Sequence, residues 1–279
     1  MVGELAASAT AAAWGAADYC GGKASRRASA AAVVVVSQLA SLPLLAIALL
    51  VIGIGWPGAP AIGWGFLAGV SGGAGLVLLY RALATGVMSV VAPTTAVTAA
   101  SIPLVVGLLS DRSPGAVALT GAAMAVVAIG LVSVSPAHHR IARPTRTVAL
   151  ALAAGVAFGL FYVLLAPVPA GAGLWPLAGV RAGSLLSALV VVAPAAASLR
   201  LTRDTLPWVV GAGALDIGAN AAFLAAVYNG QLSVVGPIAS LYPAGTVLLA
   251  LIVDRERLRP MQSLALGLAG VALVLTHLG

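Results

Sequence analysis

Long apolar stretches, separated by short breaks that hold nearly every charge, dominate this sequence. A helix needs about 20 mostly apolar residues to cross a bilayer, because each residue advances it by about 1.5 Å. Ten stretches meet this requirement: 5–22, 30–52, 61–80, 87–109, 115–135, 147–167, 174–198, 206–228, 232–253 and 261–278. None alternates in polarity as membrane β-strands do. The sequence therefore predicts an all-α membrane protein with ten transmembrane helices.

Charged side chains are too scarce to cover a soluble globule. They make up 8% of the 279 residues, whereas soluble domains average about 25%. The net charge of +7 reflects few acidic residues rather than basic clusters, so we expect no nucleic-acid partner. Cys20 is the one cysteine, which excludes an internal disulfide framework and a thiolate metal cluster. The expected partners are the lipid bilayer and a small molecule, with no metal, no cofactor and no requirement for an oligomer.

The two halves of the sequence are related by a shift of 144 positions. The shift aligns 64–93 with 208–237 and gives 9 identities in 30 positions, among them Trp64 with Trp208. A tryptophan match does not follow from an excess of Ala, Gly and Val. Each unit holds five helices, an odd number, so the second unit must enter the membrane from the opposite side. Many transporters use such inverted repeats to alternate between two conformations around a midplane site.

Basic residues gather in alternate loops. The loops after odd-numbered helices hold 12 of the 14 Lys and Arg residues. The predicted units are 1–136 and 146–279. In the first unit the basic residues follow its first and third helices, and in the second unit they follow its second and fourth helices, as inverted copies that share one cytoplasm require. The positive-inside rule then places both termini outside the cytoplasm. Thirteen Arg against one Lys, with abundant Ala, Gly and Val, suggests a GC-rich bacterial genome, so we expect a multi-pass protein of the bacterial inner membrane.

Several motifs occur in an order that resembles the EamA-like, ten-helix members of the drug/metabolite transporter superfamily. The matching motifs are Trp14-Gly15, more weakly Phe158-Gly159, Leu79-Tyr80-Arg81-Ala82-Leu83, Pro243, Glu256-Arg257, Gln262, Gly267 and Gly270. The first half departs from the pattern, with Asp111-Arg112 in place of Glu-Arg and Pro103 misplaced relative to Pro243. The resemblance implies export or exchange of small metabolites, often amino acids or related compounds. It also implies a central cavity lined by helices 1, 3, 4, 6, 8 and 9.

Three charged residues fall inside the predicted spans: Asp18, Arg181 and Asp216. A charge at mid-bilayer costs about 3 kcal/mol on insertion scales, so each needs a physical reason. Asp216 lies near mid-span, and Asn220 follows one turn later on the same helix face. Asp216 is therefore either a lumen residue that binds a substrate ammonium or a coupling proton, or the structural partner of Arg181. Asp18, nearer a span end, either reaches the headgroups or serves as a cation or proton site.

Uncharged side chains complete the predicted substrate site. Thr94 and Thr98 share one stripe of the fourth helix with Ser101, although membrane threonines often bond only to their own helix. The full set of predicted substrate-binding residues is Asp216, Asn220, Thr94, Thr98, Tyr242, Trp14 and Tyr162.

One motif suggests an enzyme. The run Gly69-Val70-Ser71-Gly72-Gly73 fits the Gly-x-Ser-Gly of rhomboid-like intramembrane serine proteases. A serine nucleophile needs a histidine base within hydrogen-bond reach. The three histidines, His138, His139 and His277, lie in a loop or near the chain end. Glycines four residues apart are also typical of close helix contacts, so we expect no enzyme.

The leading hypothesis is a secondary transporter that works by alternating access around a site between the two repeats. The alternative is a membrane scaffold or receptor that uses the repeats only as a fold. Long soluble segments would favour that alternative, and the longest predicted loop has about a dozen residues.

Overall fold

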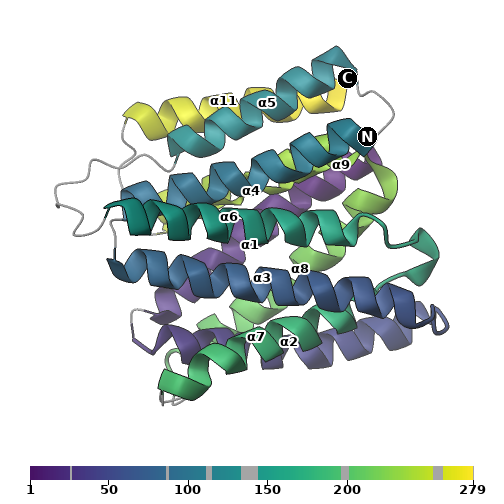
Figure 1. The fold of residues 1–279 in the computed structure, drawn as a ribbon, viewed down its shortest axis with the longest axis vertical. Coiled ribbons are helices and arrows are strands. Elements are labelled where there is room, and N and C mark those ends of the chain that lie inside the picture. The colour runs from purple at the N-terminus through teal and green to yellow at the C-terminus, as the bar shows by residue number, and fades with distance from the viewer. Residues whose placement is uncertain are drawn as a thin grey trace.

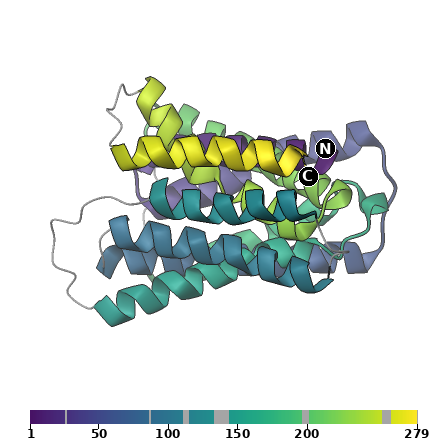
Figure 2. The same cartoon turned by 90° about the horizontal axis from the view of Figure 1, so that it is seen from above.

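The long apolar stretches of the sequence form helices that lie side by side in one elongated bundle (Figure 1). The computed structural model describes residues 1–25, 27–85, 88–110, 115–132, 144–195, 201–253 and 260–278. Within those ranges there is no strand, and one short 3-10 turn, Ala170–Ala172, precedes α7. The N-terminus and the end of α11 lie at the same end of the bundle, here called the terminal end (Figures 1 and 2).

Nine of the ten predicted spans are single helices within the described ranges. In chain order the helices are α1 Val2–Ser25, α2 Ala30–Ile52, α3 Ala59–Thr85, α4 Met88–Ser110, α5 Ala116–Val132, α6 Pro144–Leu165, α7 Pro176–Ala195, α8 Leu206–Asn229, α9 Leu232–Ala239, α10 Tyr242–Val253 and α11 Pro260–Leu278. No predicted boundary of these nine spans is more than five residues from the observed one, the largest difference being at Thr85.

The ninth predicted span is divided into two helices, α9 and α10, by Ser240 and Leu241. Proline explains the division, because Pro243 has no N–H for the carbonyl of Ala239. The chain tightens there: the Leu241 N–H donates to Ile238 over 3.0 Å, and the Ala244 N–H donates to Leu241 over 2.9 Å. The continuous helix expected over 232–253 was therefore wrong at this point.

Four helices in the described ranges are both long and apolar enough to cross a membrane. They are Ala32–Ile52, Ala59–Leu79, Thr145–Leu165 and Leu206–Asn229. Shorter apolar helical segments are Thr94–Ser110, Ala116–Leu131, Pro176–Val190 and Ser263–Thr276. These helices are those of a multi-pass membrane protein, while the count of ten spans stays a prediction.

The helices of the two halves interleave. Helix α3 packs on α6 and α7, and α8 packs on α1 and α2. In the same way α4 packs on α6, while α9 and α10 pack on α1. Helix α5 packs on α11, at one edge of the bundle (Figure 1). Exchanging the halves converts the contacts of α3 and α4 into those of α8, α9 and α10, and it maps the contact between α5 and α11 onto itself, which is the pattern that a repeat predicts.

Glycine sets how closely these helices approach. A Cβ atom on Gly69 of α3 would overlap the carbonyl of Val180 in α7. A Cβ atom on Gly213 of α8, which the 144-residue shift pairs with Gly69, would overlap the carbonyl of Ser37 in α2. The predicted role of Gly69 in close helix packing is therefore confirmed, and its sequence mate makes the corresponding contact.

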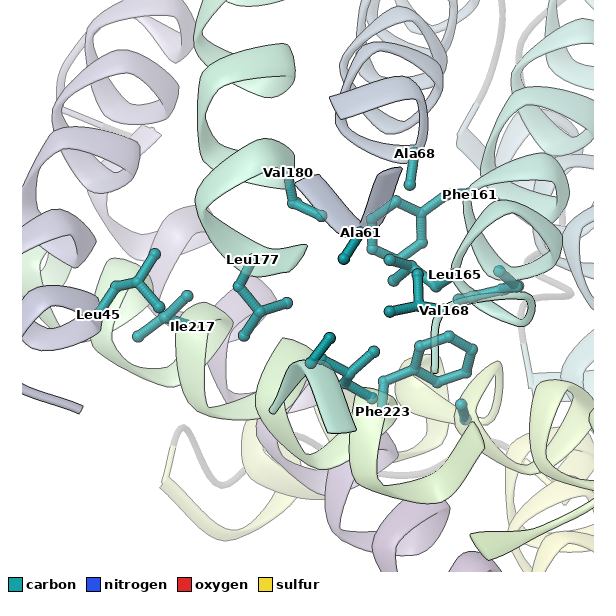
Figure 3. Packing of buried hydrophobic residues seen from close by; sticks show 14 of the residues in the cluster. Leu45, Ala61, Ala68, Phe161, Leu165, Val168, Leu177, Val180, Ile217 and Phe223 are labelled. Atoms are coloured by element: carbon teal, nitrogen blue, oxygen red, sulfur yellow. The ribbon is translucent and has the colours of Figure 1, made fainter. Parts of the chain in front are cut away.

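A large cluster of buried apolar residues draws on α2, α3, α6, α7 and α8. Figure 3 shows Leu45, Leu177 and Ile217 on one side of it and Phe161 and Phe223 on the other. The cluster continues through the connection between α6 and α7 with Leu165, Val168 and Ala172.

That connection lies at the terminal end. The Tyr228 hydroxyl, at the end of α8, donates to the Gly173 carbonyl over 3.0 Å, and Gly3 lies against Gly230. The buried apolar cluster therefore fills the bundle toward the terminal end.

Candidate functional site

Five aromatic side chains from four helices meet at the centre of the bundle. They are Trp14 of α1, Phe161 and Tyr162 of α6, Phe223 of α8 and Tyr242 of α10, here called the central aromatic cluster. The Trp14 ring centroid lies 5.7 Å from Tyr162, 5.8 Å from Phe223 and 6.4 Å from Tyr242. The predicted site residues Trp14, Tyr162 and Tyr242 therefore do come together.

The division between α9 and α10 places Tyr242 in this cluster. Tyr242 is the first residue of α10, and Gly15 of α1 lets that helix approach closely. A Cβ atom on Gly15 would lie 2.8 Å from the Tyr242 carbonyl oxygen. The Thr246 hydroxyl also donates to the Gly15 carbonyl over 3.1 Å. The Trp14-Gly15 motif thus supplies both an aromatic ring and the space for the helix that carries Tyr242.

Arg181 and Asp216 form an ion pair. The Arg181 Nη1 lies 2.7 Å from the Asp216 Oδ2, and the same nitrogen donates to Gln38 Oε1. The Asn220 Nδ2 donates to both the backbone carbonyl and the Oδ1 of Asp216, over 2.6 and 3.2 Å. The structural pairing that the sequence left open is therefore present, and it joins α2, α7 and α8.

The two partners differ in exposure. The Arg181 side chain is 2% exposed, whereas that of Asp216 is 29% exposed. Two nitrogens of Arg181, Nε and Nη2, are buried and have no hydrogen-bond partner in the part of the chain that the structure describes. Arg181 is thus a buried cation, and only one of its three nitrogens bonds to a described residue.

Asp18 lies deeper in its helix than the sequence suggested. Helix α1 continues to Ser25, seven residues beyond Asp18, which is about 10 Å along the axis. Asp18 is exposed and lies one turn after Trp14, on the same face of α1. It lies near enough to Asp216 for the two negative charges to repel each other, and it also lies near Tyr162. No hydrogen bond or ion pair to another described residue holds its carboxylate.

Both carboxylates lie on the same side of the central aromatic cluster. Helix α1 runs away from the terminal end, and Asp18 follows Trp14 in it. Helix α8 runs toward the terminal end, and Asp216 precedes Phe223 in it. Asp18 and Asp216 therefore both lie beyond the cluster, on the side opposite the terminal end.

The predicted threonines of α4 lie at a helix contact. The Thr98 hydroxyl donates to the Thr94 carbonyl of its own helix over 2.6 Å. The Thr98 Cβ also packs against Gly155 of α6. Its neighbour Thr95 is buried and donates to the Ala151 carbonyl over 3.1 Å. Substrate binding by Thr94 and Thr98 stays a prediction.

Ser71 makes a helix contact as well, because its hydroxyl donates to the Ala157 carbonyl of α6 over 2.7 Å. The residues that bear on its protease alternative, His138 and His139, lie outside the described residues, as does the side chain of His277. The family motifs Asp111-Arg112 and Glu256-Arg257 and the side chains of Tyr80, Arg81 and Gln262 also lie outside them.

Three residues of the site were not predicted. Gln38 is an isolated amide in the apolar stretch 30–52, and that isolation was a usable signal. Phe161 and Phe223 gave no signal, because apolar rings in apolar helices do not reveal which way they point.

A separate hollow of about 350 Å³ lies at the terminal end. It is lined by Glu4, Asn229, Gln231 and neighbouring residues, and Glu4 pairs there with the N-terminal ammonium group. This hollow includes no residue of the central aromatic cluster.

Comparisons with known proteins agree with a helical transporter fold. The sequence model of the EamA-like transporter family matches residues 145–278. No curated protein matches the chain. A protein of known crystal structure aligns with a TM-score of 0.78 over 99% of this chain and 96% of its own length, at 14% sequence identity. Similarity at that identity shows a shared fold over nearly the whole chain and carries no conclusion about function.

Proposed function

We propose that the protein is a secondary transporter, because the sequence model of the EamA-like transporter family matches residues 145–278. It exports or exchanges small metabolites, such as amino acids or related compounds, by alternating access. The observation that carries this proposal is the central aromatic cluster with two carboxylates beside it, the exposed Asp18 and the partly exposed Asp216, in a bundle of apolar helices.

The site draws on both halves of the chain. Trp14 comes from the first half, and Tyr162, Phe223 and Tyr242 come from the second. A movement of one half against the other would therefore separate or close the rings around a substrate. Sites between two repeats, next to a divided helix such as α9 and α10, are common in secondary transporters.

The pattern of exposure supports a state that is open at one end. Asp18 is exposed and Asp216 partly so, whereas Tyr162 and Phe223 beneath them are at most 4% exposed. Toward the terminal end the buried apolar cluster of Leu165, Leu177 and their neighbours closes the bundle. Water and substrate would therefore reach the carboxylates from the end opposite the termini, and transport would require this closure to open.

The charges beside the cluster indicate which carboxylate would bind a cationic group. A membrane-interior carboxylate needs water, a cation or a proton. Arg181 neutralises Asp216, and Asn220 is hydrogen-bonded to the same residue. Asp18 has no such partner among the described residues, so it is the carboxylate that would bind a substrate ammonium or a coupling proton.

Two measurements on the purified protein test the proposal. A thermal-shift screen against a metabolite panel identifies compounds that bind the folded state, because such compounds raise its melting temperature. Counterflow into proteoliposomes then tests whether the bound compounds are carried. We expect labelled compound to accumulate only in vesicles preloaded with the unlabelled one. A protein that binds compounds but never accelerates their movement would instead be a receptor.

A further inference from the structure

The buried guanidinium of Arg181 presents a free edge. Its Nη1 serves both Asp216, over 2.7 Å, and Gln38. The remaining two nitrogens, Nε and Nη2, are buried without an acceptor among the described residues. The side chain is 2% exposed, so bulk water does not solvate them freely.

The free edge has the geometry of a carboxylate fork. The Nε–H and one Nη2–H of a guanidinium point in parallel and match the two oxygens of a carboxylate. Asp216 contacts only the Nη1 nitrogen, through Oδ2. Buried donors without acceptors are costly. A further planar anion on the Nε–Nη2 edge would satisfy both of them.

The position of Arg181 suits a substrate contact. Its partner Asp216 lies seven residues before Phe223 of the central aromatic cluster. Seven residues are two helical turns, so the two side chains share one face of α8, about 10 Å apart along the axis. Asp18 lies on the facing helix α1, near enough to Asp216 for the two negative charges to repel each other. A cation-binding group and an anion-binding group therefore lie beyond the same rings.

We propose that the Nε–Nη2 edge of Arg181 binds a carboxylate of the transported substrate. The protein then selects substrates that carry a carboxylate, and Asp18 binds the cationic group when the substrate is a zwitterion. This inference rests on the proposed function and narrows its substrate class. A purely structural Arg181 would only hold α2, α7 and α8 together, and it would give no preference between an acid and its amide.

The first test needs no variant. Binding of the amino acids to the wild-type protein is compared with binding of their carboxamides, which keep the ammonium group and the side chain but lack the anion. We expect each amide of a bound acid to bind at least about tenfold more weakly, because a hydrogen-bonded charge pair is lost. Amides that bind as well as the acids would overturn the inference.

The second test assigns the preference to Arg181. Arg181→Lys keeps the positive charge beside Asp216 but lacks the two-nitrogen edge, so the ratio of acid to amide affinity should fall about tenfold. Arg146→Lys, at an exposed position of α6, is the matched control and should keep the wild-type ratio. An unchanged ratio in a folded Arg181→Lys protein would overturn the inference. If that variant does not fold, the double change Arg181→Gln with Asp216→Asn, which leaves no unpaired charge, gives the same readout.

The outcomes separate the two proposals. If the protein carries only compounds without a carboxylate, the inference about Arg181 is wrong and the proposed function stands. If no compound of a broad metabolite panel is carried, the proposed function is itself wrong, and the inference falls with it.

Discussion

Arg181 of α7 and Asp216 of α8 are joined by a 2.7 Å ion pair, and their exposures are unequal at 2% and 29%. Because of this inequality, we expect removal of each partner to lower the free energy of unfolding by a different amount. Without Asp216 a fully buried cation loses its counter-charge, whereas without Arg181 a partly exposed carboxylate remains.

We therefore expect Asp216→Asn to lower the melting temperature in detergent more than Arg181→Gln does. Asp216→Asn should lower the free energy of unfolding by about 3 kcal/mol, as for other buried pairs that lose one partner. The double variant should recover most of that loss, because no unpaired charge remains. Equal effects of the two single changes, or additive effects in the double variant, would show that the pair does not act as a unit.

Close glycine contacts between the halves give a second prediction. Gly69→Ala and Gly213→Ala each place a methyl group against a neighbouring helix carbonyl, so each should cost about 1–3 kcal/mol of stability through overpacking. Gly270→Ala is the control, because a Cβ atom there meets nothing within 4 Å. It should leave the melting temperature unchanged or slightly raised. Similar melting temperatures for all three variants would contradict the packing described above.

Asp18 gives a third prediction. Asp18→Asn removes the carboxylate that has no partner among the described residues, so it should abolish transport of a cationic or zwitterionic substrate, or uncouple it from proton movement. The measurement is substrate uptake in proteoliposomes together with the signal of an internal pH-sensitive dye. Asp204→Asn, at an exposed position before α8, should transport normally. Normal coupled transport by Asp18→Asn would exclude Asp18 from the site.

Orientation is a fourth prediction. The described basic residues Lys23, Arg27, Arg146 and Arg203 all lie beside helix ends away from the terminal end, and the positive-inside rule places that end in the cytoplasm. A reporter that is active only in the cytoplasm, fused after Gly279, should therefore be silent. A strong signal would reverse the assignment and place both termini inside.

The helices were predictable because a bilayer imposes a length and an apolar composition on each span. The division at Ser240 and Leu241 was not predicted, although Pro243 was noted. A proline inside a membrane helix produces either a kink or a full break, depending on its neighbours. Here Gly15 of α1 provides the space that α10 needs, and this contact lies 228 positions away along the chain (243 minus 15).

The site was predictable where burial of polar groups is costly. Asp216, Asn220, Asp18 and Arg181 stood out because charges and amides in an apolar helix need partners. Which partner each one takes depends on how the helices pack. Thr98 shows what the sequence could not predict. Its position on one helix face with Thr94 and Ser101 followed from the spacing, but the bond of its hydroxyl to its own helix did not.

The central claim is that a small molecule is carried through the central aromatic cluster, and counterflow with Trp14→Ala tests it most directly. Removing the indole deletes ring contacts to Tyr162, Phe223 and Tyr242, so transport should fall at least about tenfold in a protein that still folds. Trp56→Ala removes the same side chain from an exposed loop position at the terminal end and should transport like the wild type. Unchanged counterflow in a folded Trp14→Ala protein would contradict the account.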